Sequence, residues 1–430
     1  MKKRIDVITL GCSKNLVDSE RLLKRLRDCG FNVCHDSDNV KGDIVVVNTC
    51  GFIGDAKEES VNTILEYADA KNRGTIKQLY VMGCLSERYR DELKDEIPEI
   101  DKLYGKFDWD NLISDLVKDN PATLPYDRVI TTPKHYAYIK IAEGCNRFCA
   151  FCAIPLITGR YKSRPINEII DEVKLLVSKG VKEFNVIAQD LSYYGVDLGG
   201  KMLLPELIDK MAEVDGVEWI RLHYAYPAQF PFEVLDVMNR HDNVCKYLDI
   251  ALQHINDGVL SNMLRHVDKY QTLELIKTIR EKVPGIHLRT TLMVGFPRED
   301  ASAFEELKEF VNETKFERMG AFAYCEEEGT YAAERYTDAI SCDVKNARLD
   351  ELMAIQEEIS YESNRQKIGK TLKVIIDKED TDYYIGRTEF DSPEVDPEVL
   401  IKKDKPLRIG EFYKVEVIDA LPYELIALPK

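Results

Sequence analysis

Three cysteines that lie within one short stretch constrain this chain more than any other feature. Cys145, Cys149 and Cys152 stand in a CxxxCxxC spacing inside residues 143–164, which read EGCNRFCAFCAIPLITGRYKSR. Four ligands would complete a tetrahedral zinc site or bind every iron of a cubane cluster. A set of three therefore indicates an iron–sulfur cluster with one iron left open. The alternatives are a zinc knuckle, for which no fourth Cys or His stands nearby, or three unrelated thiols.

A second set of cysteines is spread over residues 1–125, where apolar runs alternate with helical patterns. We expect strands at three places, 5–10, 43–48 and 78–82. Strands that alternate with helices predict a parallel, doubly wound α/β sheet. Each strand is followed closely by a cysteine, namely Cys12, Cys50 or Cys84.

These three cysteines are expected to meet in space. The carboxyl ends of parallel strands line one edge of a sheet, and ligands bind in the crevice there. A second cluster with three cysteine ligands is therefore our interpretation. The alternative is that they are buried cysteines packed as small hydrophobic residues. That alternative suits Cys29 and Cys34 better, because they lie outside the pattern of strand ends.

Residues 126–360 are expected to form a second α/β domain after a linker marked by Pro121, Pro125 and Pro133. Six strands are expected, at 136–141, 183–188, 219–224, 247–252, 287–294 and 319–324. Because helical patterns separate them, they predict a partial (β/α)6 barrel rather than a complete eightfold one.

Polar residues and a glycine follow several of these strands, where a barrel of this kind places its chemistry. They are Gln189, Gln253 with His254, and Gly295. Three arginines, whose planar guanidinium groups suit carboxylates, are further candidates for substrate contacts: Arg160, Arg164 and Arg265. The alternatives are solvated surface arginines and a histidine packed in the core.

The last segment, residues 361–430, contains five short runs of alternating polarity with Gly and Pro between them, which predicts a small antiparallel β-barrel. From Ser363 onward it holds 12 Lys and Arg against 14 Asp and Glu. Single-stranded RNA is usually bound in a positive groove with stacking aromatic residues. An acidic barrel is better suited to a basic protein partner.

The overall composition points the same way. The net charge of −17 argues against a surface built for phosphate backbones. Eleven cysteines with ligand-like spacing indicate a reducing compartment. Asp6 interrupts the first apolar run, as a signal peptide would not, and no window has the roughly 18 apolar residues that span a bilayer. We expect a cytoplasmic protein.

The stretch 143–164, with Gly144 before its first cysteine and Phe151 before its last, resembles the cluster loop of radical S-adenosylmethionine (SAM) enzymes. The order of the three parts, ending in a barrel that looks like a TRAM domain, is similar to the radical SAM methylthiotransferase family along the whole chain. One branch of that family modifies the β-carbon of an aspartate in the twelfth small-subunit ribosomal protein, and the other modifies an adenosine in transfer RNA. Four stretches look like the ribosomal-protein branch: 9–15, 48–53, 152–157 and 223–227. The transfer-RNA branch typically has Gln and Met where Ser13 and Lys14 stand.

The resemblance implies two [4Fe-4S] clusters and SAM as cofactors. It implies that Cys145, Cys149 and Cys152 hold the cluster that cleaves SAM, and that Cys12, Cys50 and Cys84 hold the cluster that carries the sulfur. The family's SAM contacts fall here on the aromatic Phe151, on Gln189 for the amine, on Gln253 for the ribose and on Gly295 for the adenine.

The implied reaction replaces an unactivated C–H bond by C–S–CH3. A hydrogen atom must first be removed, which no side-chain base can do at such a weakly acidic carbon, so the cofactor must carry this step. The resemblance also implies an external low-potential electron donor and a monomer. A hypothesis of another class is a two-cluster electron-transfer protein, which would not cleave SAM.

Overall fold

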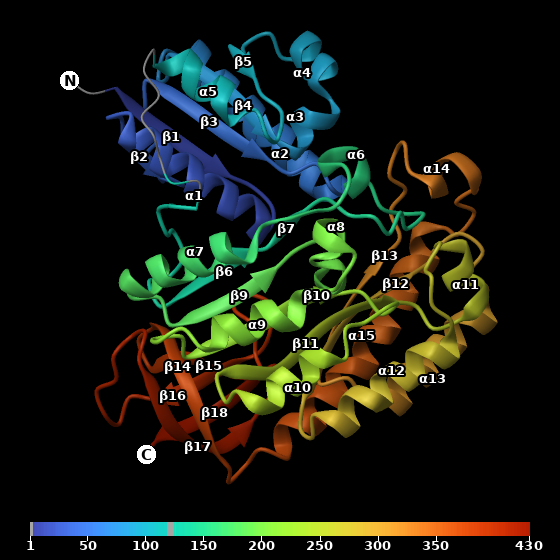
Figure 1. The fold of residues 1–430 in the computed structure, drawn as a ribbon. Coiled ribbons are helices and arrows are strands. Elements are labelled where there is room, and N and C mark those ends of the chain that lie inside the picture. Colours follow the sequence, from blue (N-terminus) through green and yellow to red (C-terminus); the bar gives the residue numbers. More distant parts are fainter. Residues whose placement is uncertain (1–2, 118–123, 125) are drawn as a thin grey trace.

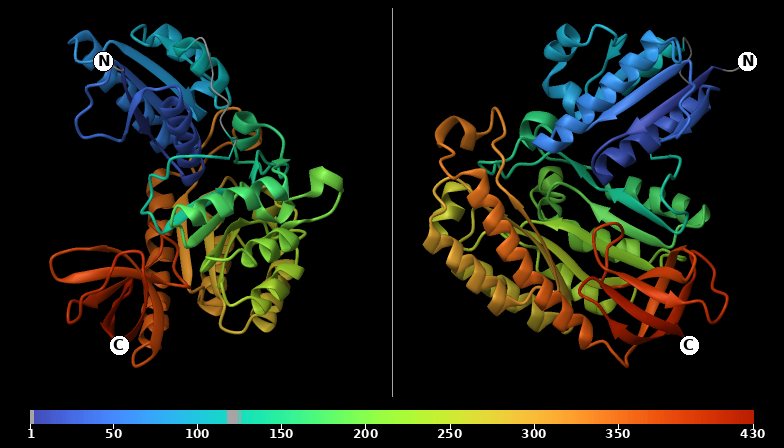
Figure 2. Two further views of the ribbon diagram at one scale, coloured as in Figure 1. Left: turned by 60° about the vertical axis from the view of Figure 1, so that its left-hand side comes forward. Right: turned by 180° about the vertical axis from the view of Figure 1, so that it is seen from behind.

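The computed structural model describes residues 3–117, 124 and 126–430. Pro121 and Pro125 of the expected linker lie outside the described residues. The chain forms three parts, with the first α/β unit at one end, the central α/β unit in the middle and a β-barrel at the other end (Figures 1 and 2). Among the described residues, no helix is long and apolar enough to cross a membrane.

The first unit is a five-stranded parallel sheet, as expected. In spatial order its strands are β2 (Asn32–His35), β1 (Arg4–Thr9), β3 (Ile44–Thr49), β4 (Gln78–Gly83) and β5 (Lys102–Leu103). Its helices are α1 (Ser13–Asp28), α2 (Gly54–Asn72), α3 (Cys84–Arg88), α4 (Arg90–Glu96) and α5 (Trp109–Leu116). The two edge strands, β2 and β5, were not expected, because they are short and only partly buried.

Alternate residues of the buried strand β3 face two separate cores, which confirms the doubly wound sheet. Val46 packs with Leu22 of α1 and Leu112 of α5 on one face. Val45 and Val47 belong to the core on the other face, which α2 covers. Side chains that alternate with a period of two explain why a strand buried on both faces reads as one continuous apolar run.

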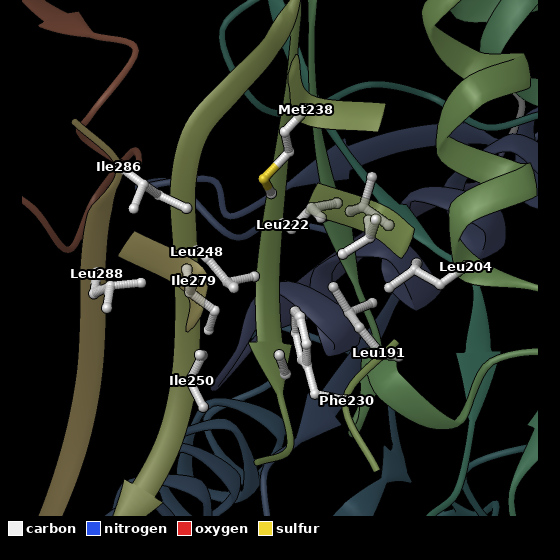
Figure 3. Packing of buried hydrophobic residues seen from close by; sticks show 14 of the residues in the cluster. Leu191, Leu204, Leu222, Phe230, Met238, Leu248, Ile250, Ile279, Ile286 and Leu288 are labelled. Carbon is white, nitrogen blue, oxygen red and sulfur yellow. The ribbon is translucent and has the colours of Figure 1, made fainter. Parts of the chain in front are cut away.

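The central unit is an open sheet of six parallel strands, also as expected. The order is β13 (Arg318–Ala323), β12 (His287–Val294), β11 (Val244–Gln253), β10 (Trp219–Ala225), β9 (Glu183–Ile187) and β6 (Tyr136–Lys140). The longer helices that connect these strands are α7 (Ile166–Ser178), α9 (Leu204–Ala212), α10 (Glu233–Arg240), α12 (Lys269–Lys282) and α13 (Ala301–Thr314). Leu222, Leu248 and Ile279 are among the side chains that fill the layer between strands and helices (Figure 3).

Shorter elements extend the carboxyl ends of the central strands. They are β7 (Ala142–Glu143), α6 (Ile154–Thr158), β8 (Lys162–Ser163), a 3-10 turn at Leu191–Tyr193, α8 (Val196–Gly199), α11 (Asp257–Asn262) and α14 (Tyr331–Arg335). Most of the loops that carry the sequence-predicted site residues lie among them.

A long helix, α15 (Cys342–Arg365), leads from the central unit into a closed five-stranded barrel. Around the barrel the strands are β14 (Thr371–Glu379), β15 (Tyr383–Thr388), β16 (Glu398–Lys402), β18 (Glu424–Pro429) and β17 (Phe412–Ala420). The prediction of an antiparallel barrel was wrong at one seam, because β16 and β18 pair in parallel. An odd number of strands cannot alternate in direction around a closed ring, so one parallel pair is required.

The barrel packs against the amino ends of the central strands through buried ion pairs. Glu183, the first residue of β9, accepts hydrogen bonds from Arg387 of the barrel. Arg318, the first residue of β13, donates to Asp391. Because the barrel covers this end of the sheet, the carboxyl ends of the strands remain available at the opposite end, toward the first unit.

Candidate active site

The structure places Cys12, Cys50 and Cys84 at the carboxyl ends of three neighbouring strands. Cys12 directly precedes α1, Cys50 directly follows β3, and Cys84 is the first residue of α3. The backbone at Gly11 runs so close to Cys50 that a Cβ on Gly11 would lie 2.6 Å from the Cβ of Cys50. The three cysteines therefore lie at one edge of the sheet, where the strand pattern predicts them.

Two lysines set the electrostatics of this first triplet. Although burial raises it, the positive charges of Lys14 and Lys106 lower the pKa of the Cys12 thiol below its ordinary value. Lys106 Nζ also lies 3.8 Å from Cys84 Sγ. Burial raises the pKa of Cys50 to about 11. Nearby cations favour thiolates, which are the form that binds metal.

Cys145, Cys149 and Cys152 lie on the loop between β7 and α6. The backbone N–H of Arg147 donates to Cys145 Sγ at 3.5 Å, and Arg265 Nη1 donates to Cys149 Sγ at 3.4 Å. Donors of this kind orient and stabilise the sulfur ligands of a cluster.

Gly144 allows this loop to close. Its φ is +72°, and a Cβ there would lie 2.1 Å from the carbonyl oxygen of Arg160. Any other residue at this position would separate the two sides of the cluster loop.

A single metal ion and a cluster place different demands on three cysteine ligands. A structural zinc ion needs its sulfur ligands about 2.3 Å from one centre. Within residues 3–117, 124 and 126–430, no group of three or more His, Cys, Asp or Glu side chains could hold one ion. In a cluster each cysteine binds its own iron, so the thiols stand farther apart.

The two triplets are carried by elements that contact each other across the boundary between the two α/β units. Helix α3, which begins at Cys84, contacts α6, which begins two residues after Cys152. Three further contacts join the units nearby. Lys57 Nζ and Arg88 Nη1 donate to the Glu327 carboxylate at 2.8 and 3.1 Å, and Arg88 Nη2 donates to the carbonyl of Glu328. This arrangement could not be inferred from either triplet alone.

The four expected SAM contacts lie at or near the carboxyl ends of the central strands. Phe151 packs edge-on against Phe296, with 6.3 Å between ring centroids. Gln189 follows β9 and is partly buried. Gln253 ends β11 with φ at +73°, and its buried Oε1 has no hydrogen-bond partner among the described residues.

Gly295 has a packing requirement of its own. Its φ is +73°, and a Cβ there would lie 2.3 Å from Cγ of Lys345 in α15. Its N–H donates to Glu299 at 2.8 Å. The structure thus explains this glycine without a ligand.

The other polar candidates lie in different surroundings. Arg265 lies at the second triplet, whereas Arg160 is exposed and stacks on Phe148. Arg164 is engaged within the chain, where it pairs with Glu168 and Glu172. His254 is fully buried; its Nδ1 accepts a hydrogen bond from the backbone N–H of Asn256, and its Nε2 lies 3.6 Å from the Glu299 carboxylate.

Sequence reasoning missed a cluster of charged and aromatic groups beside the second triplet. Arg147 Nε donates to Asp190 at 2.6 Å, and the guanidinium groups of Arg147 and Arg265 lie 4.3 and 4.1 Å from the centroid of the Tyr226 ring. Burial raises the pKa of Asp190 above its ordinary value, against the opposing effect of Arg147. The position of Arg147 between Cys145 and Cys149 was the sequence signal that could have indicated these charged and aromatic groups.

Three family models match the chain, one for each part. They are "Uncharacterized protein family UPF0004" over residues 4–105, "Radical SAM superfamily" over 139–311 and "TRAM domain" over 368–429.

Solved structures share the fold at low sequence identity. One is the radical S-adenosylmethionine methyltransferase TsrM from Kitasatospora setae, solved with cobalamin and a [4Fe-4S] cluster. It is 15% identical, with a TM-score of 0.57 and 77% of each chain covered. Another is the cobalamin-dependent radical enzyme OxsB, with 11% identity, a TM-score of 0.53, and 83% of this chain and 56% of that chain covered. The open parallel sheet, the cysteine loop and the superfamily match define the class: this chain is a radical SAM enzyme.

Curated relatives narrow the class to one family. The chain is 64% identical over 427 residues to the ribosomal protein uS12 methylthiotransferase RimO of Phocaeicola vulgatus, covering 99% of each chain. It is 62% identical to the protein of that name from Bacteroides thetaiotaomicron, covering 99% and 98%, and 50% identical to that from Flavobacterium johnsoniae, covering 100% and 98%. The chain belongs to the RimO family of methylthiotransferases.

Proposed function

We propose that this chain adds a methylthio group to the β-carbon of an aspartate in ribosomal protein uS12, with two [4Fe-4S] clusters and SAM as cofactors. The observation that carries this proposal is the contact between α3, which begins at Cys84, and α6, which begins two residues after Cys152. Methylthio transfer needs a site that activates a C–H bond and a site that delivers sulfur to the same carbon. Two adjacent triplets supply both functions at one boundary.

Each triplet has the donor chemistry of a cluster site with one iron left open. Cys145, Cys149 and Cys152 would hold the cluster that binds SAM. The cluster and SAM together would supply the one-electron chemistry that removes a hydrogen atom. Arg265 donates a hydrogen bond to Cys149 Sγ, and the backbone N–H of Arg147 donates one to Cys145 Sγ. These donors stabilise negative charge on the two sulfur atoms.

Cys12, Cys50 and Cys84 would hold the second cluster, with Lys106 donating to Cys84. The resemblance to the family supports assigning the sulfur to this cluster. The two lysines beside the triplet support the binding of a cluster there, because they offset the negative charge of thiolate ligands.

The SAM contacts proposed here are Phe151, Gln189, Gln253 and Gly295. Gln253 has the strongest support, since a buried acceptor without a partner is unusual in a folded chain and suits a ligand hydroxyl or amine. Its left-handed backbone is the kind of strain that clusters at ligand sites. Gly295 has the weakest support, because Lys345 already accounts for it.

We further propose a monomer that works in the cytoplasm and takes electrons from an external low-potential donor. All eleven cysteines are unpaired, which suits a reducing compartment. Several buried arginines of the barrel and central sheet are used in internal ion pairs, and the barrel carries more acidic than basic residues. This favours a basic protein substrate over transfer RNA.

One experiment tests the reaction and separates it from its alternatives. Reduced, reconstituted protein is incubated with SAM and either a peptide of the uS12 aspartate loop or transfer RNA, and products are weighed by mass spectrometry. We expect a gain of one methylthio group on the peptide alone. A gain on transfer RNA alone would move the chain to the other branch, and absence of SAM cleavage would leave an electron-transfer protein.

A further inference from the structure

Lys14 is a buried cation that has no carboxylate partner. It is the second residue of α1, two positions after Cys12, and only 8% of its surface is exposed. No ion pair or hydrogen bond of its ammonium group occurs within residues 3–117, 124 and 126–430. By contrast, the nearby buried Lys106 and Lys140 share the carboxylate of Asp18. Its charge helps to lower the pKa of the Cys12 thiol, and its N–H donors, unused among the described residues, suit a further anion.

The contact that Lys14 does make places it at the mouth of the central sheet. Its Nζ lies 3.6 Å from the centroid of the Tyr224 ring, a cation–π contact between the first and second units. Tyr224 belongs to β10, near the carboxyl end where the central unit has its candidate active site. Lys14 thus lies between the first cysteine triplet and the carboxyl ends of the central strands.

The backbone at Tyr224 is strained in a way that fixes this position. Tyr224 has φ at +65°, and the pairing of β10 with β11 shifts register between Leu222 and Ala225. Bulges of this kind redirect side chains next to active sites, and left-handed non-glycine residues cluster there. The strain is a separate observation that marks this as a functional position.

A second donor, which has no partner among the described residues, belongs to Asn185 of β9, the strand that pairs with β10. Nδ2 of Asn185 is buried and has no hydrogen-bond partner among the described residues, while its Oδ1 contacts Nε2 of His223 at 3.2 Å. The ring of His223 lies 5.9 Å from that of Tyr224. Burial, followed by the charges of Arg221, Arg289 and Lys14, lowers the pKa of His223 and keeps it neutral. An ammonium group and an unused amide N–H are the donors that a carboxylate accepts.

We propose that Lys14 is a specificity-determining residue that binds the carboxylate of the substrate aspartate. This inference rests on the proposed function, because it takes the substrate to be an aspartate. A cation two residues from Cys12 would hold that carboxylate so that the adjacent β-carbon lies beside the first triplet. The role is separate from electron transfer and from SAM binding.

The test measures binding without turnover. Unreduced holoenzyme is titrated under anaerobic conditions with fluorescent peptides of the uS12 loop that carry either Asp or Asn at the target position. We expect the parent enzyme to bind the Asp peptide about 30-fold more tightly, as for a buried charge pair. Lys14→Met should reduce this preference to about twofold or less, and Lys14→Arg should retain most of it. Lys57→Met, which removes another lysine at the same boundary, should leave it unchanged.

Three outcomes would overturn the inference. The parent enzyme could bind both peptides equally, or Lys14→Met could keep the full preference for aspartate. Lys14→Met could instead lose about half of the bound iron, which would show that the charge of Lys14 serves only the cluster ligands. Failure of the proposed function is a different result: the parent enzyme would then leave the Asp peptide unmodified in the mass assay.

Discussion

Arg387 donates two hydrogen bonds to Glu183 across the boundary between the barrel and the central sheet, from Nη1 to Oε1 at 2.9 Å and from Nη2 to Oε2 at 2.7 Å. Both side chains are almost fully buried. Although burial raises it, the guanidinium groups of Arg387 and Arg221 lower the pKa of Glu183, so the carboxylate stays charged. The pair fixes the barrel to the amino ends of the central strands, opposite the end that carries the second cysteine triplet.

Removing Arg387 should destabilise the protein strongly. Arg387→Met leaves the carboxylates of Glu183 and Asp377 short of a partner, and we expect the free energy of unfolding to fall by about 3 to 5 kcal/mol in urea titrations. Glu411→Gln is the matched control. It breaks an exposed pair with Lys182 at the same boundary and should cost less than about 1 kcal/mol. Equal effects of the two variants would contradict the argument.

The two triplets should be separable by cysteine substitution. Cys149→Ala should lower iron from about eight to about four per chain and abolish formation of 5′-deoxyadenosine. Cys50→Ala should lose the same amount of iron but leave SAM cleavage measurable and end C–S bond formation. The exposed Cys342 gives a control, since Cys342→Ala should keep all the iron. Methylthiolated product from Cys50→Ala would refute the sulfur role of the first triplet.

Arg265 should tune the second triplet without being one of its ligands. Its Nη1 lies 3.4 Å from Cys149 Sγ. Arg265→Gln removes a positive charge beside a negatively charged cluster, so the reduced cluster is disfavoured. We expect SAM cleavage to fall about 10- to 100-fold while at least part of the iron is retained. Arg160→Gln, at an exposed position of the same loop, should change cleavage little. A reduction potential unchanged in Arg265→Gln would show that the contact has no electronic effect.

Lys367 should make stability depend on alkaline pH. Burial, followed by the charge of Arg318, lowers its pKa from 10.5 to about 8. Between these values the unfolded chain holds a proton that the folded chain has released, so the free energy of unfolding rises with pH across this window.

Lys367→Met should remove that dependence. We expect it to stabilise the protein by about 2 kcal/mol at pH 7, with the gain disappearing near pH 10.5, as measured by urea unfolding at each pH. Lys405→Met, at an exposed position of the barrel, should not alter the pH profile. A gain from Lys367→Met that is independent of pH would mean that packing, and not charge, is responsible.

Much of the fold could be predicted because its signals are local. Continuous apolar runs such as residues 44–47 mark strands buried on both faces. A cysteine just beyond such a strand falls at the sheet edge whatever the details of packing. The short edge strands β2 and β5 carry no such signal, since solvent contacts them on one side. The parallel seam of the barrel was missed because it depends on ring closure, which no single strand encodes.

In the candidate site, too, some features could be predicted from the sequence and others only from the tertiary structure. The sequence by itself determined the local CxxxCxxC spacing of Cys145, Cys149 and Cys152 and the position of Cys12, Cys50 and Cys84 just beyond three strands, from which both cluster sites are predicted. Only the tertiary structure decided that α3 contacts α6, that Arg265 reaches Cys149, and that Lys14 has no carboxylate partner among the described residues. The physical reason is that a buried charge is defined by its partner, and these partners lie far away along the chain, up to 210 residues in the case of Lys14 and Tyr224.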